Sequence, residues 1–222
     1  SYPTYSLATF SQDFATLNSD QRQPMYNRAL FGTYAPGSTF KVGVAIAALE
    51  EEIIEKDTII NAQGKYTYYS DYQPECWIYA YGGVHGYINV TEAIQESCNY
   101  FFYELADRCT WQMLDETAKG FGFGEPTGIE LTEVVGTRSN PDSKKANHAG
   151  ADAVWGAGDR VLTGIGQAEN RITPLQLCVY ASTLANQGTR YKATFLNRVA
   201  SADYRTLIYE NEPQILSQTD IP

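Results

Sequence analysis

Apolar residues recur every three or four positions in four stretches of the chain, a spacing typical of helices that bury one face. These stretches predict helices over residues 37–52, 89–108, 110–120 and 174–186. Asn89 stands three residues before Glu92 in a capping-box pattern, and Pro174 lies in the first turn of the fourth helix. We expect the first of these helices to be buried inside the domain.

The segments outside the predicted helices lack this periodicity. Residues 61–90 are crowded with Tyr, Trp and Gly, which favours short strands and loops over helix. Residues 120–159 are dominated by Gly, Pro, Asp and Asn and predict a long irregular connection, which inside a compact domain is usually functional or mobile. Beyond Arg190 the alternation of polar and apolar residues is compatible with one or two strands. Residues 1–35 are mixed in composition and rich in turns.

The charge of the chain excludes one class of partner. The sequence has 26 Asp and Glu against 16 Lys and Arg, a formal charge of −10, and its basic residues are scattered. A polyanion such as nucleic acid would therefore be repelled. No run approaches the roughly 18 apolar residues that cross a bilayer, and the first residues lack the features of a signal peptide. The missing initial Met and the abrupt end at Pro222 suggest a fragment of a longer protein.

Cysteine and histidine are the residues that a zinc site would use. The chain has four cysteines and two histidines: Cys76, Cys98, Cys109, Cys178, His85 and His148. No CxxC pair occurs, so we do not expect a zinc site. Buried free thiols are the simplest expectation, and the spacing of the cysteines does not assign a disulfide.

Ser38 and Lys41 stand three residues apart at the start of the first predicted helix, so their side chains should share a face. A serine hydroxyl is a poor nucleophile until a base takes its proton. A lysine can be that base only when burial or cationic neighbours lower its pKa from about 10.4. The apolar side chains of Phe40, Val42 and Val44 offer such burial.

The surroundings of Ser38 strengthen this interpretation. Pro36 and Gly37 predict a turn before it, so Ser38 stands where unpaired backbone N–H groups and the positive end of the helix dipole favour anionic charge. A serine and a lysine at this spacing arise by chance about once in a chain of this length. The alternative is a solvated serine at a helix start, with a surface lysine nearby.

A second candidate pair, Ser97 and Asn99, lies on the second predicted helix. A second hydroxyl can pass a proton between the base and the leaving group, and an amide two residues away can hold a peptide carbonyl. Acyl transfer by a serine with a lysine base needs both functions. The alternative is two polar positions on a half-exposed helix.

Six ordered blocks of sequence resemble the penicillin-binding proteins, specifically their monofunctional class B D,D-transpeptidases. The blocks lie between about Tyr2 and Gly188 and read SYPTY, NRALFGTYAPGSTFK, CW followed by HG, EAIQESCNYFFYEL, FGFGEPTGIEL and GIGQAENRITPLQLCVYASTLANQG. The resemblance implies an α+β transpeptidase fold of the kind shared with serine β-lactamases. It implies that residues 1–222 form one partial transpeptidase domain, mostly the helical subdomain with an incomplete central sheet.

The resemblance also implies roles for four residues. Ser38 matches the acylated nucleophile, Lys41 its base, and Ser97 with Asn99 the second motif, in which Ser97 is catalytic and Asn99 binds substrate. The implied substrate is the D-Ala–D-Ala end of a peptidoglycan stem peptide, which β-lactams imitate, and an amine of a neighbouring stem takes the acyl group. No metal or organic cofactor belongs to this chemistry.

The implied location is the extracytoplasmic face of the bacterial cell membrane, with an N-terminal anchor outside this chain. Cell-division or elongation proteins are the implied macromolecular partners. The block Gly164–Gln167 has no catalytic role that we can derive, and we expect it to pack its backbone closely behind the site.

The sequence departs from the family at the third motif, Lys followed by Thr or Ser and then Gly, which occurs nowhere in it. In the family this motif anchors the substrate carboxylate and supplies one oxyanion donor, whose loss costs about two to three orders of magnitude in rate. We therefore expect the fragment to be nearly inactive alone, and both edges of its central sheet to be truncated.

Other classes of function share parts of this pattern. β-Lactam sensor domains and serine β-lactamases carry the same two motifs, but the NRALFGTYAPGSTFK and TPLQL blocks favour the transpeptidase over both. A non-catalytic relative that scaffolds a division or elongation complex is a further alternative. A fluorescent penicillin separates it from the enzyme, because only the enzyme is labelled on Ser38.

Overall fold

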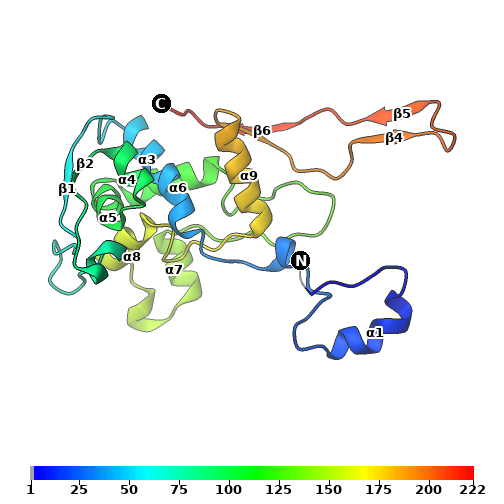
Figure 1. Ribbon diagram of the computed structural model, residues 1–222, viewed down its shortest axis with the longest axis horizontal. Coiled ribbons are helices and arrows are strands. Elements are labelled where there is room, and N and C mark those ends of the chain that lie inside the picture. Colours follow the sequence, from blue (N-terminus) through cyan, green and yellow to red (C-terminus); the bar gives the residue numbers. More distant parts are fainter. Residues whose placement is uncertain (1–2) are drawn as a thin grey trace.

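Residues 3–222 are described in the computed structural model, which combines helices with short antiparallel strand pairs (Figure 1). The α-helices are α1 (Phe10–Ser19), α2 (Arg28–Phe31), α3 (Lys41–Glu50), α4 (Val90–Gln95), α5 (Asn99–Arg108), α6 (Trp111–Gly120), α7 (Pro141–Asn147), α8 (Ala157–Thr163) and α9 (Pro174–Ala185). The 3-10 helices are η1 (Gly37–Phe40), η2 (Trp77–Tyr81) and η3 (Gly150–Ala153). The strands are β1 (Ile60–Ala62), β2 (Gly86–Ile88), β3 (Thr189–Tyr191), β4 (Arg198–Ala200), β5 (Leu207–Glu210) and β6 (Ile215–Gln218). In this part of the chain, none of the helices combines the length and the apolar character that crossing a lipid bilayer requires.

The core is built around α3, which is buried from Gly43 to Ala48. Helices α5 and α6 pack against α3, and α8 packs against α5. The large apolar side chains at the centre include Phe40, Phe101, Phe102, Leu105, Phe121 and Phe123. The predicted burial of the first helix is therefore confirmed. Its first turn is the tighter η1, so the α-helix proper begins at Lys41 and ends at Glu50.

The second predicted helix is two helices. Asn89 caps α4 through the predicted capping box with Glu92, but α4 ends at Gln95 and α5 begins at Asn99. The prediction of one continuous helix over residues 89–108 is therefore wrong. Ser97 lies in the break between the two helices rather than on a helix.

Ser97 ends α4 in the left-handed conformation, with a φ of 49°. The Cys98 N–H donates to the Ala93 carbonyl and the Ser97 N–H to the Ile94 carbonyl, which are the two hydrogen bonds of a Schellman motif. This ending usually carries glycine or asparagine at the left-handed position. Because a serine stands there, the sequence gives no indication that the helix stops.

Two other helices follow their predictions closely. Thr110 caps α6 and Thr173 caps α9 with their side-chain oxygens, and Pro174 is in the first turn of α9 as expected. The mixed segment at the start of the chain contains α1, which buries none of its residues. An exposed helix of this kind lacks the apolar stripe that would have predicted it.

The predicted irregular connection over residues 120–159 contains α7 and η3, and α8 begins at Ala157. Asn140 accepts a hydrogen bond from the Ser143 N–H at the start of α7, and Pro141 is its first residue. These are ordinary helix-start residues, so the sequence did hold an indication of α7. The helix buries no side chain, which explains why apolar periodicity does not reveal it.

The described strands pair two by two. β1 pairs with β2, β3 with β6 and β4 with β5, all antiparallel. The prediction of one or two strands after Arg190 is too low, because β3 to β6 all lie between residues 189 and 218. A shift of register interrupts the β3–β6 pair and the β4–β5 pair. These shifts break the alternation of polar and apolar residues on which the prediction was based. Figure 1 shows the β4–β5 hairpin running out from the helices.

Candidate active site

Ser38 lies on η1 and is exposed. The turn before it is held by Gly37, which has a φ of 59° and whose N–H donates to the Gly166 carbonyl at 2.9 Å. A Cβ atom on Gly166 would lie 2.2 Å from the Gly37 carbonyl oxygen, so any side chain there would displace the turn. The expected close backbone packing of the block Gly164–Gln167 is confirmed at this glycine.

Lys41 is the first residue of α3 and is only 2% exposed. Its Nζ donates to Ser97 O at 2.7 Å, to Ser97 Oγ at 3.1 Å and to Asn99 Oδ1 at 2.7 Å. Burial lowers the pKa of the Lys41 amine to about 8, while the charges of nearby Cys76 and Cys98 act in the opposite direction. A neutral fraction of this amine is therefore present near neutral pH, as a lysine base requires.

Ser97 and Asn99 reach Lys41 because of the break between α4 and α5. The left-handed Ser97 directs both its carbonyl and its hydroxyl toward the Lys41 amine. Asn99, the first residue of α5, uses its Oδ1 for the same amine, and its side chain also forms a hydrogen bond with Tyr103. The Asn99 N–H donates to Cys76 Sγ at 3.2 Å and so fixes the start of α5.

The contact expected between the Ser38 and Lys41 side chains takes a different form. Over the described part of the chain, the Lys41 Nζ hydrogen bonds go to Ser97 and Asn99, and the bond that links Lys41 to Ser38 is from its backbone N–H to the Ser38 carbonyl. In a 3-10 turn residues i and i+3 eclipse, so the two side chains still stand on the same side of η1. Catalytic hydrogen bonds are often long before substrate binds, and this arrangement is compatible with a later approach of the amine to the hydroxyl.

Cys76, His85 and Cys98 gather beside this site, a grouping that the sequence analysis missed. Their ligand atoms all lie within 4.8 Å of one another, and both cysteines are buried. Two sulfurs and an imidazole form a donor set that zinc accepts, and His85 Nδ1 lies 3.7 Å from Cys76 Sγ. These three residues could therefore hold a metal ion. The expectation of no zinc site rested on spacing along the sequence, which does not reveal donors that folding brings together.

The four cysteines are free thiols. Cys76, Cys98 and Cys109 are buried as expected, whereas Cys178 is exposed. The Cys76 and Cys98 sulfurs lie 4.0 Å apart. The hydrogen bond with Cys98, with help from backbone N–H groups, lowers the pKa of the Cys76 thiol below its usual range.

Comparison with known proteins agrees with this fold. The model of the penicillin binding protein transpeptidase domain matches residues 3–221. The peptidoglycan D,D-transpeptidase MrdA of Acinetobacter baumannii is 33% identical over 180 residues, which cover 80% of this chain and 26% of that protein. The structure of the penicillin-binding protein PBP2 from Helicobacter pylori has a TM-score of 0.82 at 27% identity and covers 99% of this chain and 39% of its own.

A second solved structure similar to this chain is a complex between PBP2 and MreC from Helicobacter pylori. It is 30% identical, with a TM-score of 0.77, and covers 93% of this chain and 38% of its own. The chain spans about a quarter of the length of the curated relative from A. baumannii. The α+β transpeptidase fold expected from the sequence is confirmed. Because the domain model matches nearly every residue, this chain belongs to the penicillin-binding protein transpeptidase family.

Proposed function

We propose that the protein containing this chain is a peptidoglycan D,D-transpeptidase that cross-links the cell wall through an acyl-enzyme on Ser38. The observation that carries the proposal is the buried Lys41 amine, held by Ser97 and Asn99 and placed three residues after an exposed serine. A buried lysine with a lowered pKa can act as a base, and the serine on the same turn offers it a hydroxyl. The activity named for the A. baumannii relative supports the same chemistry.

In the proposed acylation, the neutral Lys41 amine takes the proton of Ser38 Oγ while this oxygen attacks the carbonyl of the D-Ala–D-Ala bond. The C–N bond then breaks, and the terminal D-Ala leaves as an amine that receives the proton from Lys41 through Ser97 Oγ. The Ser97 hydroxyl suits this relay because it lies 3.1 Å from the Lys41 Nζ. The step leaves an ester on Ser38 and returns Lys41 to its neutral form.

In the second step, an amine of a neighbouring stem peptide attacks the ester. The amine loses a proton, which returns to Ser38 Oγ along the same path, and the new amide is the cross-link. Asn99 holds a carbonyl of the substrate with its side-chain NH₂, since its Oδ1 is engaged by Lys41. A β-lactam follows the first step and remains as the acyl group.

The anchor for the substrate carboxylate is not assigned to any residue, because the Lys–Thr/Ser–Gly triplet of the family does not occur within residues 1–222. We expect the 222-residue chain alone to be acylated slowly, since one missing oxyanion donor costs about two to three orders of magnitude in rate. The proposal includes a location at the outer face of the bacterial cell membrane. It also includes an elongation protein as partner, which the PBP2–MreC complex of H. pylori supports.

A fluorescent penicillin tests the proposal on the natural gene product that contains this chain. We expect a covalent label that maps to Ser38 and is lost in Ser38→Ala. The matched control is Ser182→Ala, which removes an exposed hydroxyl from α9 and should keep the label. No label on the folded wild-type protein at a saturating dose would overturn the enzyme and favour a non-catalytic scaffold. Rapid release of hydrolysed drug would favour a β-lactamase instead.

A further inference from the structure

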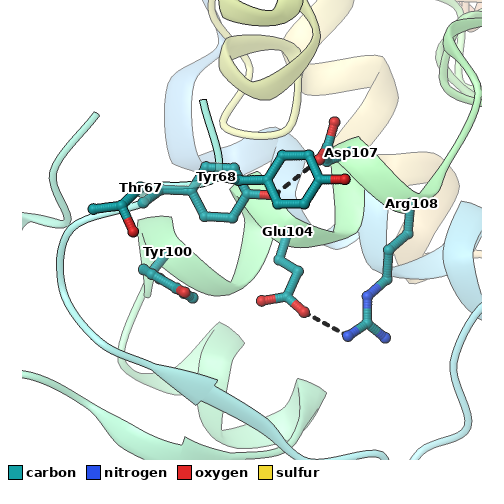
Figure 2. A pocket seen from close by; sticks show the side chains of 7 residues that line it. Thr67, Tyr68, Tyr100, Glu104, Asp107 and Arg108 are labelled. Carbon is teal, nitrogen blue, oxygen red and sulfur yellow. Dashed lines mark hydrogen bonds and ion pairs between the residues drawn. The ribbon is translucent and has the colours of Figure 1, made fainter. Parts of the chain in front are cut away.

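A pocket of about 380 Å³ lies against the outer side of α5, where the segment before η2 crosses that helix. Figure 2 shows aromatic and charged side chains around it, and the lining includes Tyr66, Tyr68, Tyr100, Glu104, Asp107 and Arg108. The residues from α5 recur at helical spacing, so they project from one face of the helix. The pocket extends along α5 from Tyr100, next to Asn99, to Arg108 at the other end of the helix.

The aromatic wall of the pocket combines the exposed ring of Tyr68 with the buried ring of Tyr66, and ring contacts connect them. Tyr68 is 74% exposed, yet its ring stacks on Tyr66 with centroids 6.3 Å apart and meets Tyr69 edge-on at 5.0 Å. Tyr66 in turn meets Tyr100 edge-on at 5.4 Å. Side chains that are ordered before binding lose little conformational entropy when a ligand docks. The exposed ring of Tyr68 is therefore a preorganised contact surface for an apolar face of a ligand.

The carboxylate of Asp107 at the floor of the pocket is fully engaged. It accepts hydrogen bonds from the hydroxyls of Tyr66 and Tyr69, and Arg160 of α8 forms an ion pair with it at 3.4 Å. Burial, followed by the bond to Asp107, raises the pKa of Tyr66 above its usual range and that of Tyr69 to about 12. Both hydroxyls therefore stay protonated and keep donating to Asp107, which leaves no free charge at the floor.

The rim of the pocket is also neutral overall. Glu104 and Arg108 form an ion pair with each other one helical turn apart, and the dashed line in Figure 2 marks this contact. Because each carboxylate of the pocket has a cationic partner, neither an isolated cation nor an isolated anion would be attracted strongly. The pocket therefore favours a neutral ligand whose hydroxyl or amide groups can form hydrogen bonds with the Glu104 carboxylate and the Arg108 guanidinium.

A neutral ligand with one apolar face and many hydroxyl groups is a sugar. Its C–H face can lie on the exposed ring of Tyr68, while adjacent hydroxyls bond to Glu104 and Arg108 and to the Thr67 hydroxyl at the rim. We propose that this pocket is a subsite for a saccharide unit of the cell-wall glycan. The inference rests on the proposed function, because the stem peptides of peptidoglycan are attached to glycan strands. A glycan held along α5 would lie on the helix whose first residue, Asn99, belongs to the candidate active site.

Calorimetric titration with a soluble tetramer of N-acetylglucosamine tests the subsite on the natural gene product that contains this chain. We expect saturable binding that weakens at least about tenfold in Tyr68→Ala, because the variant lacks the ring that supplies the apolar contact surface. Glu104→Gln should weaken it less and Tyr68→Phe should restore most of it. The matched control is Tyr87→Ala on β2, which removes a tyrosine that is 76% exposed outside the pocket and should leave binding unchanged.

The outcomes separate this proposal from the proposed function. Penicillin labelling of Ser38 should persist in Tyr68→Ala, since Tyr68 takes no part in acylation. Sugar binding without penicillin labelling would contradict the proposed function but support the subsite. No saturable binding to the wild-type protein, or equal loss in Tyr68→Ala and Tyr87→Ala, would overturn the subsite. Tighter binding of tetramethylammonium than of the sugar would also overturn it, because the pocket would then select a cation.

Discussion

The helical body around α3 and the arm of residues 189–218, which carries β3 to β6, use apolar side chains in opposite ways. On α5, Phe102 is 0% exposed and packs in the core, whereas on β5, Ile208 is 66% exposed. Every residue of β5 is exposed, so neither face of the β4–β5 pair is covered by the described part of the chain. Both regions contain large apolar side chains, but only the helical body packs them together.

This contrast explains where the candidate chemistry lies. The pKa of Lys41 is lowered because burial removes water from its amine, and the helical body provides that burial. The arm has little comparable interior: Arg190 of β3 is buried, and burial lowers the pKa of its guanidinium, whereas every residue of β5 is exposed. The four candidate site residues all lie in the body, and variants in both regions can test whether its packing is the reason for their reactivity.

Lys41→Arg should produce the largest change. The guanidinium keeps the charge but does not act as a base near neutral pH, so penicillin labelling should fall by roughly a thousandfold or more. The measurement is the rate of labelling by fluorescent penicillin in the natural gene product, with circular dichroism to verify folding. Lys145→Arg, a change at an exposed lysine on α7, should label at the wild-type rate. Retained labelling in Lys41→Arg would exclude Lys41 as the base.

Phe102→Ala and Ile208→Ala compare the packing of the two regions directly. The first removes a fully buried ring next to the Lys41 amine and should lower the free energy of unfolding by about 3–5 kcal/mol. The second removes an exposed side chain from the arm and should change it by less than about 0.5 kcal/mol. Urea denaturation measures both, and similar losses in the two variants would contradict the contrast between body and arm.

The burial of Lys41 should also appear in the pH dependence of stability. Its pKa falls from the ordinary value of 10.5 to about 8 in the folded chain, so the amine is protonated in both states below about pH 8 and carries the full burial penalty there. Between about pH 8 and 10.5 the unfolded chain holds a proton that the folded chain has released, and stability rises by about 3 kcal/mol. Lys41→Met should remove this rise from denaturation curves, whereas Lys145→Met should keep it. The labelling rate should increase with pH and level off above about 8.

Gly166→Ala should have a smaller effect on stability but a specific effect on labelling. The left-handed backbone at this position, with a φ of 67°, costs about 1–2 kcal/mol for alanine. Its Cβ would also displace the Gly37 turn before Ser38, so labelling should slow. Gly150→Ala is a matched control, because Gly150 has a φ of 61° but no atom within 4 Å of an added Cβ. The same labelling rate in both variants would show that the Gly37–Gly166 contact does not position Ser38.

The sequence predicts the helices where a start residue and an apolar stripe occur together, as at Thr110 and Thr173. It misses the break at Ser97, because the apolar spacing of α4 continues into α5 and no glycine marks the left-handed position. Local propensity cannot report such an ending, since the two hydrogen bonds of the Schellman motif belong to the folded backbone.

The sequence likewise predicts one part of the candidate site and misses another. Its residues could be named from motifs, but the partners of Lys41 could not, because Ser97 and Asn99 meet it only after α3 and α5 pack together. The grouping of Cys76, His85 and Cys98 is equally invisible in the sequence, where no two of them are spaced as ligands usually are. Pairings across more than fifty residues depend on the tertiary fold rather than on local pattern.

At position 97, the stability of the fold and the proposed catalytic role favour different residues. Glycine would relieve about 1–2 kcal/mol of conformational cost there and would keep the carbonyl that meets Lys41, but it would delete the hydroxyl. A library of variants selected only for heat resistance should therefore drift to glycine at position 97. If the proposed function holds, selection for cross-linking of the cell wall should keep serine there, at the cost of a less stable fold.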